Sequence, residues 1–386
     1  MENSLIYMDH SATTPMREEV LEVMLPFFRE RYGNPSSLHA PGRAVRAAVE
    51  EAREKTALAL GADPGEIFFT SGGTESNNIA LRGVAKRRGT KGHIITSSIE
   101  HHAILDVCRD MEKQGYSVTF LPVDNQGRVN PADVEKAITA DTFIISIMFA
   151  NNEIGTIQPI AEIGAIAKSR GILFHCDAVQ AIGQLPVDVR ELNLDLLSLS
   201  AHKFNGPKGV GALYKKKKTP LSPLYNGGGQ EGKLRPGTEN VPAIVGLGRA
   251  IELAASELPS KADRLTKLRE RLIEGLLVID DVLINGHREL RLPNNVNASF
   301  KYIEGESILL GLDLQGVAVS SGSACSSGSL DPSHVLSAIG LDHATSHGSI
   351  RFSLGLGNSE SEVDQVIEII KPVVERLRKM SPTYHS

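Results

Sequence analysis

The chain has 386 residues, of which 41 are Lys or Arg and 46 are Asp or Glu, so its formal net charge is −5. This weakly acidic balance disfavours nucleic acid as the main partner, because binding to phosphates requires a basic surface. The longest largely apolar stretch, at 143–150, is far shorter than the roughly 20 residues of a membrane-spanning helix. We therefore expect a protein that does not span a membrane.

The three cysteines, Cys108, Cys176 and Cys325, lie far apart in the sequence. An odd number without close pairs disfavours both a disulfide framework and a zinc site built from cysteines. The N-terminus shows no basic region followed by an apolar run, so a signal peptide is not expected. Together these features favour a reducing, cytoplasmic location.

Hydrophobic periodicity predicts two helices near the N-terminus, over 18–31 and 44–60. From residue 66 to residue 214, short strand patterns alternate with helical ones. This alternation is typical of an α/β fold, in which helices cover both faces of a mostly parallel sheet, here of seven strands. The strands are expected at 66–70, 93–97, 117–123, 143–149, 172–176, 194–199 and 209–214, and the helices between them end near residues 88, 114, 138 and 170.

After residue 225 the pattern changes. A stretch rich in Gly and charge at 226–237 predicts a loop, and a long amphipathic helix is expected over 241–277 with a break near Pro259. Shorter strands at 298–300, 317–320 and 349–353 and a final helix at 361–379 follow. We expect a large α/β domain over 15–256 and a smaller α+β domain formed by 1–14 and 257–386.

Ligands of open parallel sheets bind at the carboxyl ends of the strands, so polar residues there are the first candidates for a site. The run 71–75, Ser-Gly-Gly-Thr-Glu, follows the first of these strands and precedes a helix. Gly73 and Thr74 could form a cup for a phosphate, because a helix N-terminus attracts anions. Alternatively, Ser71 or Thr74 simply caps the helix.

Two further strand ends carry an acid and an amine. Asp177, with Gln180 three residues on, could face a ligand or cap a helix. Lys203 stands in a turn rich in Gly and Pro, where a buried amine can form a Schiff base, although most lysines are solvated surface residues. A phosphate cup, an acid for the pyridinium nitrogen and a lysine, each at its own strand end, match the needs of pyridoxal phosphate.

Four other residues are candidates. His101 follows a strand, where its ring could stack on a ligand, transfer a proton or merely pack, and Asn152 ends another strand in a polar turn. Arg351 could bind a substrate carboxylate or form a structural ion pair. Cys325 stands in a run of Ser and Gly, where it could be a nucleophile or sulfur carrier, or an incidental thiol in a linker.

Six motifs that occur in order resemble those of the cysteine desulfurases, a family of fold-type I pyridoxal phosphate enzymes in the class V aminotransferase group. The likeness runs from residue 7 to about residue 384. The long run around Cys325 is similar to that of the first group of the family, the nitrogen-fixation and housekeeping iron–sulfur assembly types. The motifs are Gly-Asn-Pro-Ser-Ser-Leu-His at 33–39, Thr-Ser-Gly-Gly-Thr-Glu-Ser-Asn at 70–77, Asn-Asn-Glu-Ile-Gly at 151–155, Ala-His-Lys at 201–203, Arg-Pro-Gly-Thr-Glu-Asn at 235–240 and Ser-Gly-Ser-Ala-Cys-Ser-Ser-Gly at 321–328.

The resemblance implies a role for each candidate in holding pyridoxal phosphate. Lys203 would carry the cofactor, Asp177 would pair with its pyridine nitrogen, and Gln180 would bind its ring hydroxyl. His101 would stack on the ring and move protons. The phosphate would be held by Gly73, Thr74, Ser200 and His202, and by Thr238 of a second copy of the chain, which implies a homodimer.

The resemblance also implies the reaction. Asn152 and Arg351 would bind the carboxylate of L-cysteine, and Cys325 would take its sulfur as a persulfide while L-alanine is released. The sulfur would pass to a scaffold protein for iron–sulfur clusters, and Cys325 could also serve as a metal ligand to a shared cluster.

Two alternative functions remain at this point. Another class V enzyme, such as a selenocysteine lyase or an aminotransferase, is disfavoured by Cys325. A non-enzymatic sulfur carrier or assembly scaffold that kept the fold is disfavoured by the joint presence of Lys203 and Asp177.

Overall fold

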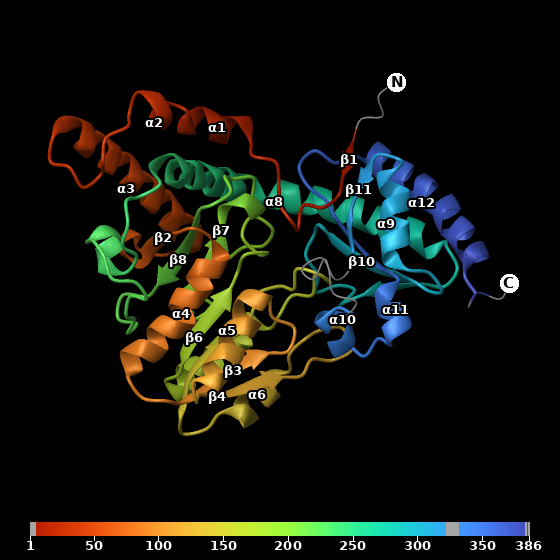
Figure 1. Cartoon of the computed structure of the whole chain (residues 1–386), viewed down its shortest axis with the longest axis horizontal. Coiled ribbons are helices and arrows are strands. Elements are labelled where there is room, and N and C mark those ends of the chain that lie inside the picture. The colour runs from red at the N-terminus through yellow and green to blue at the C-terminus, as the bar shows by residue number, and fades with distance from the viewer. Residues whose placement is uncertain (1–4, 322–331, 383, 385–386) are drawn as a thin grey trace.

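A computed structural model describes residues 5–321, 332–382 and 384. The chain forms two bodies, one around a seven-stranded sheet and one around a four-stranded sheet (Figure 1). The strand order of the larger sheet is β2 (Ile67–Thr70), β8 (Gly211–Lys215), β7 (Leu196–Ser200), β6 (Leu173–Asp177), β5 (Thr142–Ser146), β3 (His93–Ser97) and β4 (Ser117–Leu121). β8 is antiparallel to both of its neighbours, β2 and β7, and the other strand pairs of this sheet are parallel. The prediction of a mostly parallel seven-stranded sheet is therefore confirmed.

Helices cover both faces of this sheet because its strands are apolar on both sides. Ile94 and Ile144 point into one hydrophobic core, whereas their neighbours Ile95 and Ile145 point into the other, as the two-residue period of a strand requires. The first core lies under α4 (Gly73–Arg88) and α5 (His102–Lys113). The second lies under α3 (Ala40–Leu60), α6 (Pro131–Ala137), α7 (Ile160–Arg170) and the first half of α8 (Val241–Leu277).

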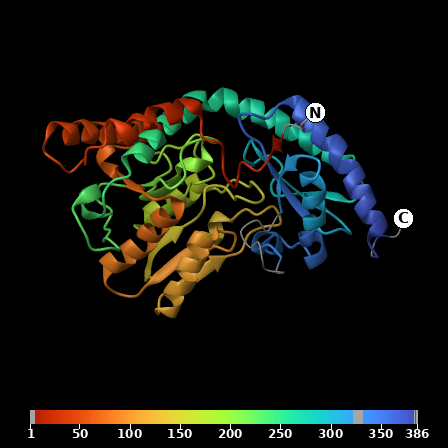
Figure 2. The same cartoon turned by 45° about the horizontal axis from the view of Figure 1, so that its top comes forward.

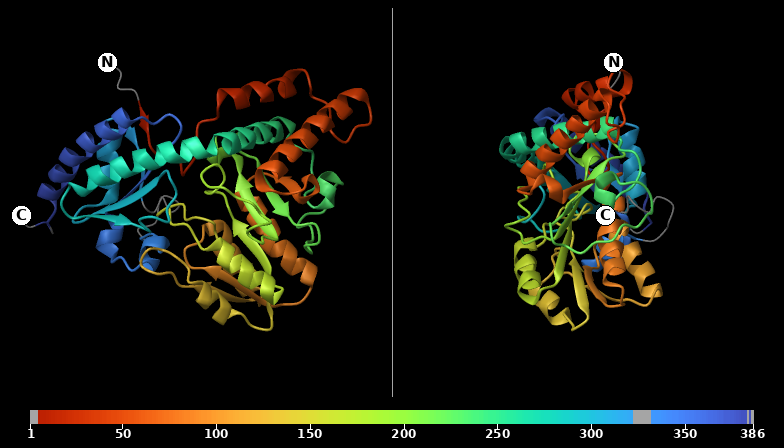
Figure 3. Two further views of the ribbon diagram at one scale, coloured as in Figure 1. Left: turned by 180° about the vertical axis from the view of Figure 1, so that it is seen from behind. Right: turned by 90° about the vertical axis from the view of Figure 1, so that its left-hand side faces the viewer.

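The long helix α8 joins the two bodies without interruption, so the predicted break near Pro259 is wrong (Figure 3). A proline inside a helix costs about 3 kcal/mol, but Pro259 is exposed and both halves of the helix bury apolar faces. Lys261 Nζ donates to the carbonyl of Gly183 at 2.8 Å, which ties this region to the larger body. The predicted domain boundary between residues 256 and 257 falls inside α8 and stays a prediction.

The smaller body combines the start of the chain with its last third. Its four-stranded antiparallel sheet has the order β12 (Ser320–Ser321), β13 (Ser349–Ser353), β10 (Asn295–Phe300) and β9 (Val282–Asn285). β1 (Ile6–Tyr7) pairs in parallel with β11 (Val317–Ala318). The second half of α8 packs with α9 (Gly305–Asp313) and α12 (Glu360–Met380) around this body's core, and α12 and the N-terminal helices lie along α8 (Figure 2).

Short elements account for most differences from the predicted boundaries. The single helix expected at 18–31 is two, α1 (Glu18–Met24) and α2 (Pro26–Arg29), because Pro26 starts a new helix. The sequence pattern did not indicate β9, α9, α10 (His334–Ala338) or α11 (His343–His347). Single turns of helix at Pro64–Glu66 (η1), Ala201–Lys203 (η2) and Gln230–Lys233 (η3) complete the elements. Within the described ranges, no helix is long and apolar enough to cross a membrane.

Candidate active site

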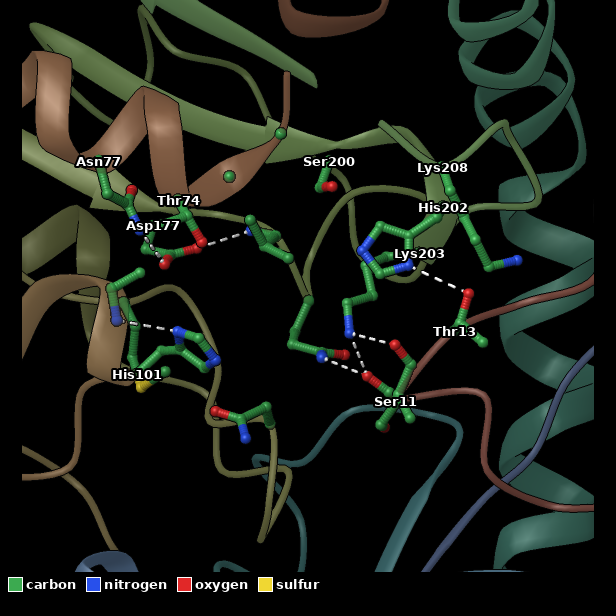
Figure 4. A pocket seen from close by; sticks show the side chains of 18 of the residues that line it. Ser11, Thr13, Thr74, Asn77, His101, Asp177, Ser200, His202, Lys203 and Lys208 are labelled. Carbon is green, nitrogen blue, oxygen red and sulfur yellow. Dashed lines mark hydrogen bonds between the residues drawn. The ribbon is translucent and has the colours of Figure 1, made fainter. Parts of the chain in front are cut away.

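A cavity of about 600 Å³ opens at the carboxyl ends of β6 and β7, beside the N-terminus of α4 (Figure 4). It brings together most of the predicted site residues, namely Gly73, Thr74, His101, Asn152, Asp177, Gln180, Ser200, His202, Lys203 and Arg351. Thr238 is exposed and does not line this cavity. Cys325 lies outside the described residues.

The N-terminus of α4 forms a narrow cradle at one end of the cavity. Its capping residue is Gly72, which has no side-chain cap, so the alternative of a cap by Ser71 or Thr74 is wrong. Gly72 has a φ of 152°, a conformation that favours glycine. A Cβ on Gly73 would stand 2.6 Å from Val179 Cγ2. The first N–H groups of the helix lack partners within the helix, so the cradle suits an anion.

Lys203 lies in η2, directly after β7, and its amine reaches the segment that follows β1. Its Nζ donates to the carbonyl of Ser11 at 2.5 Å and to that of Ala12 at 2.8 Å. Next to it, His202 Nδ1 lies 3.1 Å from Thr13 Oγ1. The start of the chain therefore forms one wall of the cavity, which the strand pattern did not predict.

Asp177 ends β6 and is held by two donors. Asn77 Nδ2 donates to its Oδ2 at 2.7 Å, and the N–H of Val179 donates to its Oδ1 at 3.0 Å. Asn77 lies one turn after Gly73 in α4, so one helix supplies both the cradle and the support of the acid. Asn77 is not among the predicted site residues, although its four-residue spacing from Gly73 could have indicated it.

Both histidines of the cavity have a pKa below that of a free imidazole. Burial lowers the pKa of His101, Lys203 adds to this effect, and the charge of Asp177 opposes it. His101 Nδ1 accepts a hydrogen bond from the N–H of Ala103 at 3.1 Å, so the proton of the neutral ring belongs on Nε2. Burial, together with Lys203 and Lys208, lowers the pKa of His202 to about 4.

Arg351 enters the cavity from β13 of the smaller body. Its Nη1 donates to the carbonyl of Asn152 at 3.1 Å, and its Nη2 forms an ion pair with Asp9 at 2.9 Å. Its buried Nε has no hydrogen-bond partner among the described residues. Arg351 therefore forms the structural ion pair that the sequence left open, and it also lines the cavity, whereas its binding of a substrate carboxylate stays a prediction.

Two buried carboxyls behind the cavity were also missed. Glu100 Oε1 accepts from Ser97 Oγ at 2.6 Å and from the N–H of Met148 at 2.9 Å, and burial raises its pKa to about 8. Glu153 Oε2 accepts from Ser333 Oγ at 2.5 Å, and burial raises its pKa to about 7. Charged residues usually face solvent, so nothing in the pattern distinguished these two.

The side chains around this cavity fit pyridoxal phosphate. The α4 cradle is complementary to a phosphate, Asp177 is an acid for a pyridine nitrogen, and Lys203 supplies an amine at the same opening. Asn77 Oδ1 is buried and has no hydrogen-bond partner among the described residues. Buried polar atoms normally have a partner, so this one fits a cavity that binds a polar ligand. The volume is also within the usual range for a site that takes a small molecule.

Comparisons with known proteins agree with this geometry. A model of the aminotransferase class-V family matches residues 6–366. The cysteine desulfurase IscS of Methanosarcina thermophila is 58% identical over 382 residues, which cover 99% of this chain and 95% of that protein. The solved structure of a NifS-like protein has a TM-score of 0.92 at 43% identity and covers 97% of this chain and 100% of its own. A structure of SspA in complex with cysteine has a TM-score of 0.82 at 41% identity, with 90% and 98% covered.

Proposed function

We propose that this chain, which belongs to the cysteine desulfurases of the aminotransferase class-V family, converts L-cysteine to L-alanine and transfers the sulfur to Cys325 as a persulfide. The observation that carries the proposal is that Asp177, Lys203 and Arg351 line one cavity although they come from β6, η2 and β13. The similarity to SspA, which was solved with cysteine, supports the choice of substrate. The cofactor is pyridoxal phosphate.

When bound, pyridoxal phosphate supplies an electrophilic carbon for the substrate amine and an electron sink that acidifies the α-carbon. The α4 cradle would hold the phosphate, together with Ser200, His202 and Thr74. Asp177, fixed by Asn77, would keep the pyridine nitrogen protonated, and Gln180 would bind the ring hydroxyl. His101 would pack beside the ring. The Ser11 and Ala12 carbonyls orient the Lys203 amine, which holds the cofactor and later takes the α-proton of the substrate.

Arg351 and Asn152 orient the substrate. The guanidinium of Arg351 is fixed by Asp9 and by the carbonyl of Asn152, so it offers a carboxylate a positioned, buried positive charge.

Sulfur transfer forms one bond to the substrate sulfur while another bond to it breaks. The thiolate of Cys325 forms an S–S bond with the substrate sulfur while the carbon–sulfur bond breaks and its electron pair stays with carbon, which a proton converts to the methyl group of alanine. The persulfide then passes to an acceptor, which we infer to be a scaffold protein for iron–sulfur clusters, and Cys325 also serves there as a ligand to a shared cluster. This reaction takes place in the cytoplasm.

We infer that the active form is a homodimer. Thr238 is exposed and lies outside the cavity of its own chain, which suits a residue that reaches the phosphate of a second copy. Large apolar side chains are exposed near the N-terminus, where Leu25, Phe28, Tyr32 and Leu38 have exposed fractions of 51%, 62%, 80% and 88%. Exposed apolar side chains that recur within one short segment suit a surface that another protein covers.

The direct test is the release of alanine and sulfide from L-cysteine in the presence of a thiol reductant. We expect wild type and the exposed-lysine control Lys218→Ala to be active, because Lys218 lies outside the cavity. Lys203→Ala should lose both products, and Cys325→Ala should lose sulfide release. Substantial activity of Cys325→Ala would contradict the persulfide route and favour a lyase, whereas an inactive wild type loaded with cofactor would contradict the function as a whole.

A further inference from the structure

The short helix α11 carries two histidines whose rings face each other. His343 and His347 are four residues apart, so they share one face of the helix. Their Nε2 atoms share a hydrogen bond of 3.2 Å, which a cation bound by both would replace, and their ring centroids are 4.3 Å apart. His343 is exposed and His347 is partly exposed, so water and solutes can reach the pair.

The separation of these nitrogens suits a shared metal ion. Imidazole nitrogens bind zinc at about 2.0–2.1 Å, so two of them on one ion lie about 3.0 Å apart at a right angle and about 3.4 Å apart at a tetrahedral angle. The observed 3.2 Å falls between these values. We propose that His343 and His347 form a binding site for a first-row divalent cation such as Ni²⁺ or Zn²⁺, a class for which imidazole is a suitable ligand.

Contacts around α11 hold the backbone that carries the two rings. Asp342 caps the helix, since its Oδ1 accepts from the N–H of Thr345 at 2.9 Å and its Oδ2 accepts from Thr345 Oγ1 at 2.7 Å. At the other end, Ser349 Oγ donates to the carbonyl of Ser346 at 2.7 Å and leads directly into β13. The helix backbone is therefore anchored to a buried strand, which lowers the entropy cost of bringing both ligands to one ion.

The same contacts determine the kind of site. Both oxygens of Asp342 are already engaged by Thr345. In the part of the chain that the structure describes, no group of three or more His, Cys, Asp and Glu side chains is placed to hold a metal. The cation would thus have two protein ligands and would complete its shell with water or another small donor, which makes the site open and exchangeable rather than structural.

The other histidine pairs whose rings meet among the described residues lack this arrangement. The ring centroids of His102 and His334 are 5.1 Å apart, but His334 Nε2 is engaged at 2.9 Å by the carbonyl of Glu100. His101 and His102 are adjacent in sequence and their ring centroids are 6.3 Å apart. A substitution at α11 should therefore remove cation binding without a substitute pair nearby.

The test is a calorimetric titration of the holoenzyme with Ni²⁺ alone. We expect one site per chain in wild type, at least tenfold weaker binding for His343→Gln and for His347→Gln, and unchanged binding for His39→Asn, which removes an exposed imidazole but keeps a capping side chain on α3. Ni²⁺ should also raise the melting temperature of wild type but not of the two α11 variants.

The outcomes separate this proposal from the proposed function. Neither histidine lines the cavity, so both α11 variants should turn over L-cysteine at the wild-type rate, and a failed desulfurase assay leaves the Ni²⁺ result intact. No uptake by wild type at about 1 mM Ni²⁺, a concentration that fills even weak sites, would overturn the proposal. Equal uptake by wild type and both variants would also overturn it, because the ion would then bind elsewhere, such as at a thiol.

Discussion

At the scale of single residues, the cavity is made of charged groups whose partners are fixed before any ligand binds. Lys203 is oriented by two backbone carbonyls, Asp177 by Asn77 and a backbone N–H, and Arg351 by Asp9. Pre-oriented groups need little rearrangement during a reaction, so this order favours catalysis. This fixed arrangement leaves some buried polar atoms without a hydrogen-bond partner among the described residues. Asn77 Oδ1 and Arg351 Nε are two of them.

Glu100 gives a pH dependence that can be measured at this scale. Burial raises its pKa from 4.5 to about 8, so between these values the folded chain holds a proton that the unfolded chain has lost. The stability from this group is therefore complete below about pH 4.5 and is lost as the pH rises through about 8. Glu100→Gln keeps an oxygen acceptor for Ser97 Oγ and the N–H of Met148 but cannot ionise.

Urea unfolding at about pH 5 and about pH 8 tests this expectation. From about pH 5 to about pH 8, the free energy of unfolding should fall more for wild type than for Glu100→Gln. The difference should be on the order of a few kcal/mol. The comparison of the two proteins cancels the titration of all other groups. An equal fall in both would show that Glu100 is not held in its neutral form.

At the scale of elements, the site is positioned by the strands β3, β6 and β7 and by the helix α4. Local sequence patterns predict each of these elements. The Gly-Gly pair before an apolar helical pattern correctly predicted the start of α4, and the position of Asp177 and Lys203 at strand ends correctly predicted that both reach one cavity. Phosphate binding by the α4 cradle stays a prediction. The part played by Ser11 and Ala12 could not be predicted in this way, because a contact between segments so distant in sequence leaves no periodic pattern. The unbroken α8 likewise depends on tertiary packing, which outweighs the tendency of Pro259 to interrupt a helix.

The α4 cradle gives a prediction with a matched control. A methyl group at position 73 would meet Val179 Cγ2 at 2.6 Å, so Gly73→Ala must displace Val179 or the start of the helix. Because the N–H of Val179 also holds Asp177, both ends of the cofactor should be affected. We expect Gly73→Ala to bind pyridoxal phosphate at least tenfold more weakly in an absorbance titration, a loss of about 1.4 kcal/mol or more.

Gly65→Ala is the control for this experiment. No atom lies within 4 Å of a Cβ at position 65, so this variant adds the same methyl group without a clash. It should bind the cofactor as wild type does. Equal affinities for all three proteins would show that the narrow cradle does not hold the phosphate.

At the scale of the whole molecule, the site exists only because two bodies meet. Asp177 and Lys203 belong to the body of the seven-stranded sheet, whereas Arg351 comes from β13, and the segment after β1 bridges them. The turn at Asn152 accepts a hydrogen bond from Arg351, which joins the substrate side of the cavity to the larger body. Sequence periodicity predicted each body separately but carries no information on how they meet, so the resemblance of motifs was needed to bring Arg351 to the cavity.

We propose that these elements converge on one cofactor, which Lys203 holds. Lys208 provides a strict comparison, because its side chain also lines the cavity but is exposed. The most direct measurement is reduction of the holoenzyme with borohydride, which fixes the cofactor to whichever lysine holds it, followed by digestion and mass spectrometry. We expect a pyridoxyl group on Lys203 alone and none in Lys203→Ala. A group on Lys208 or on another lysine, or no group in wild type, would show that Lys203 does not hold the cofactor.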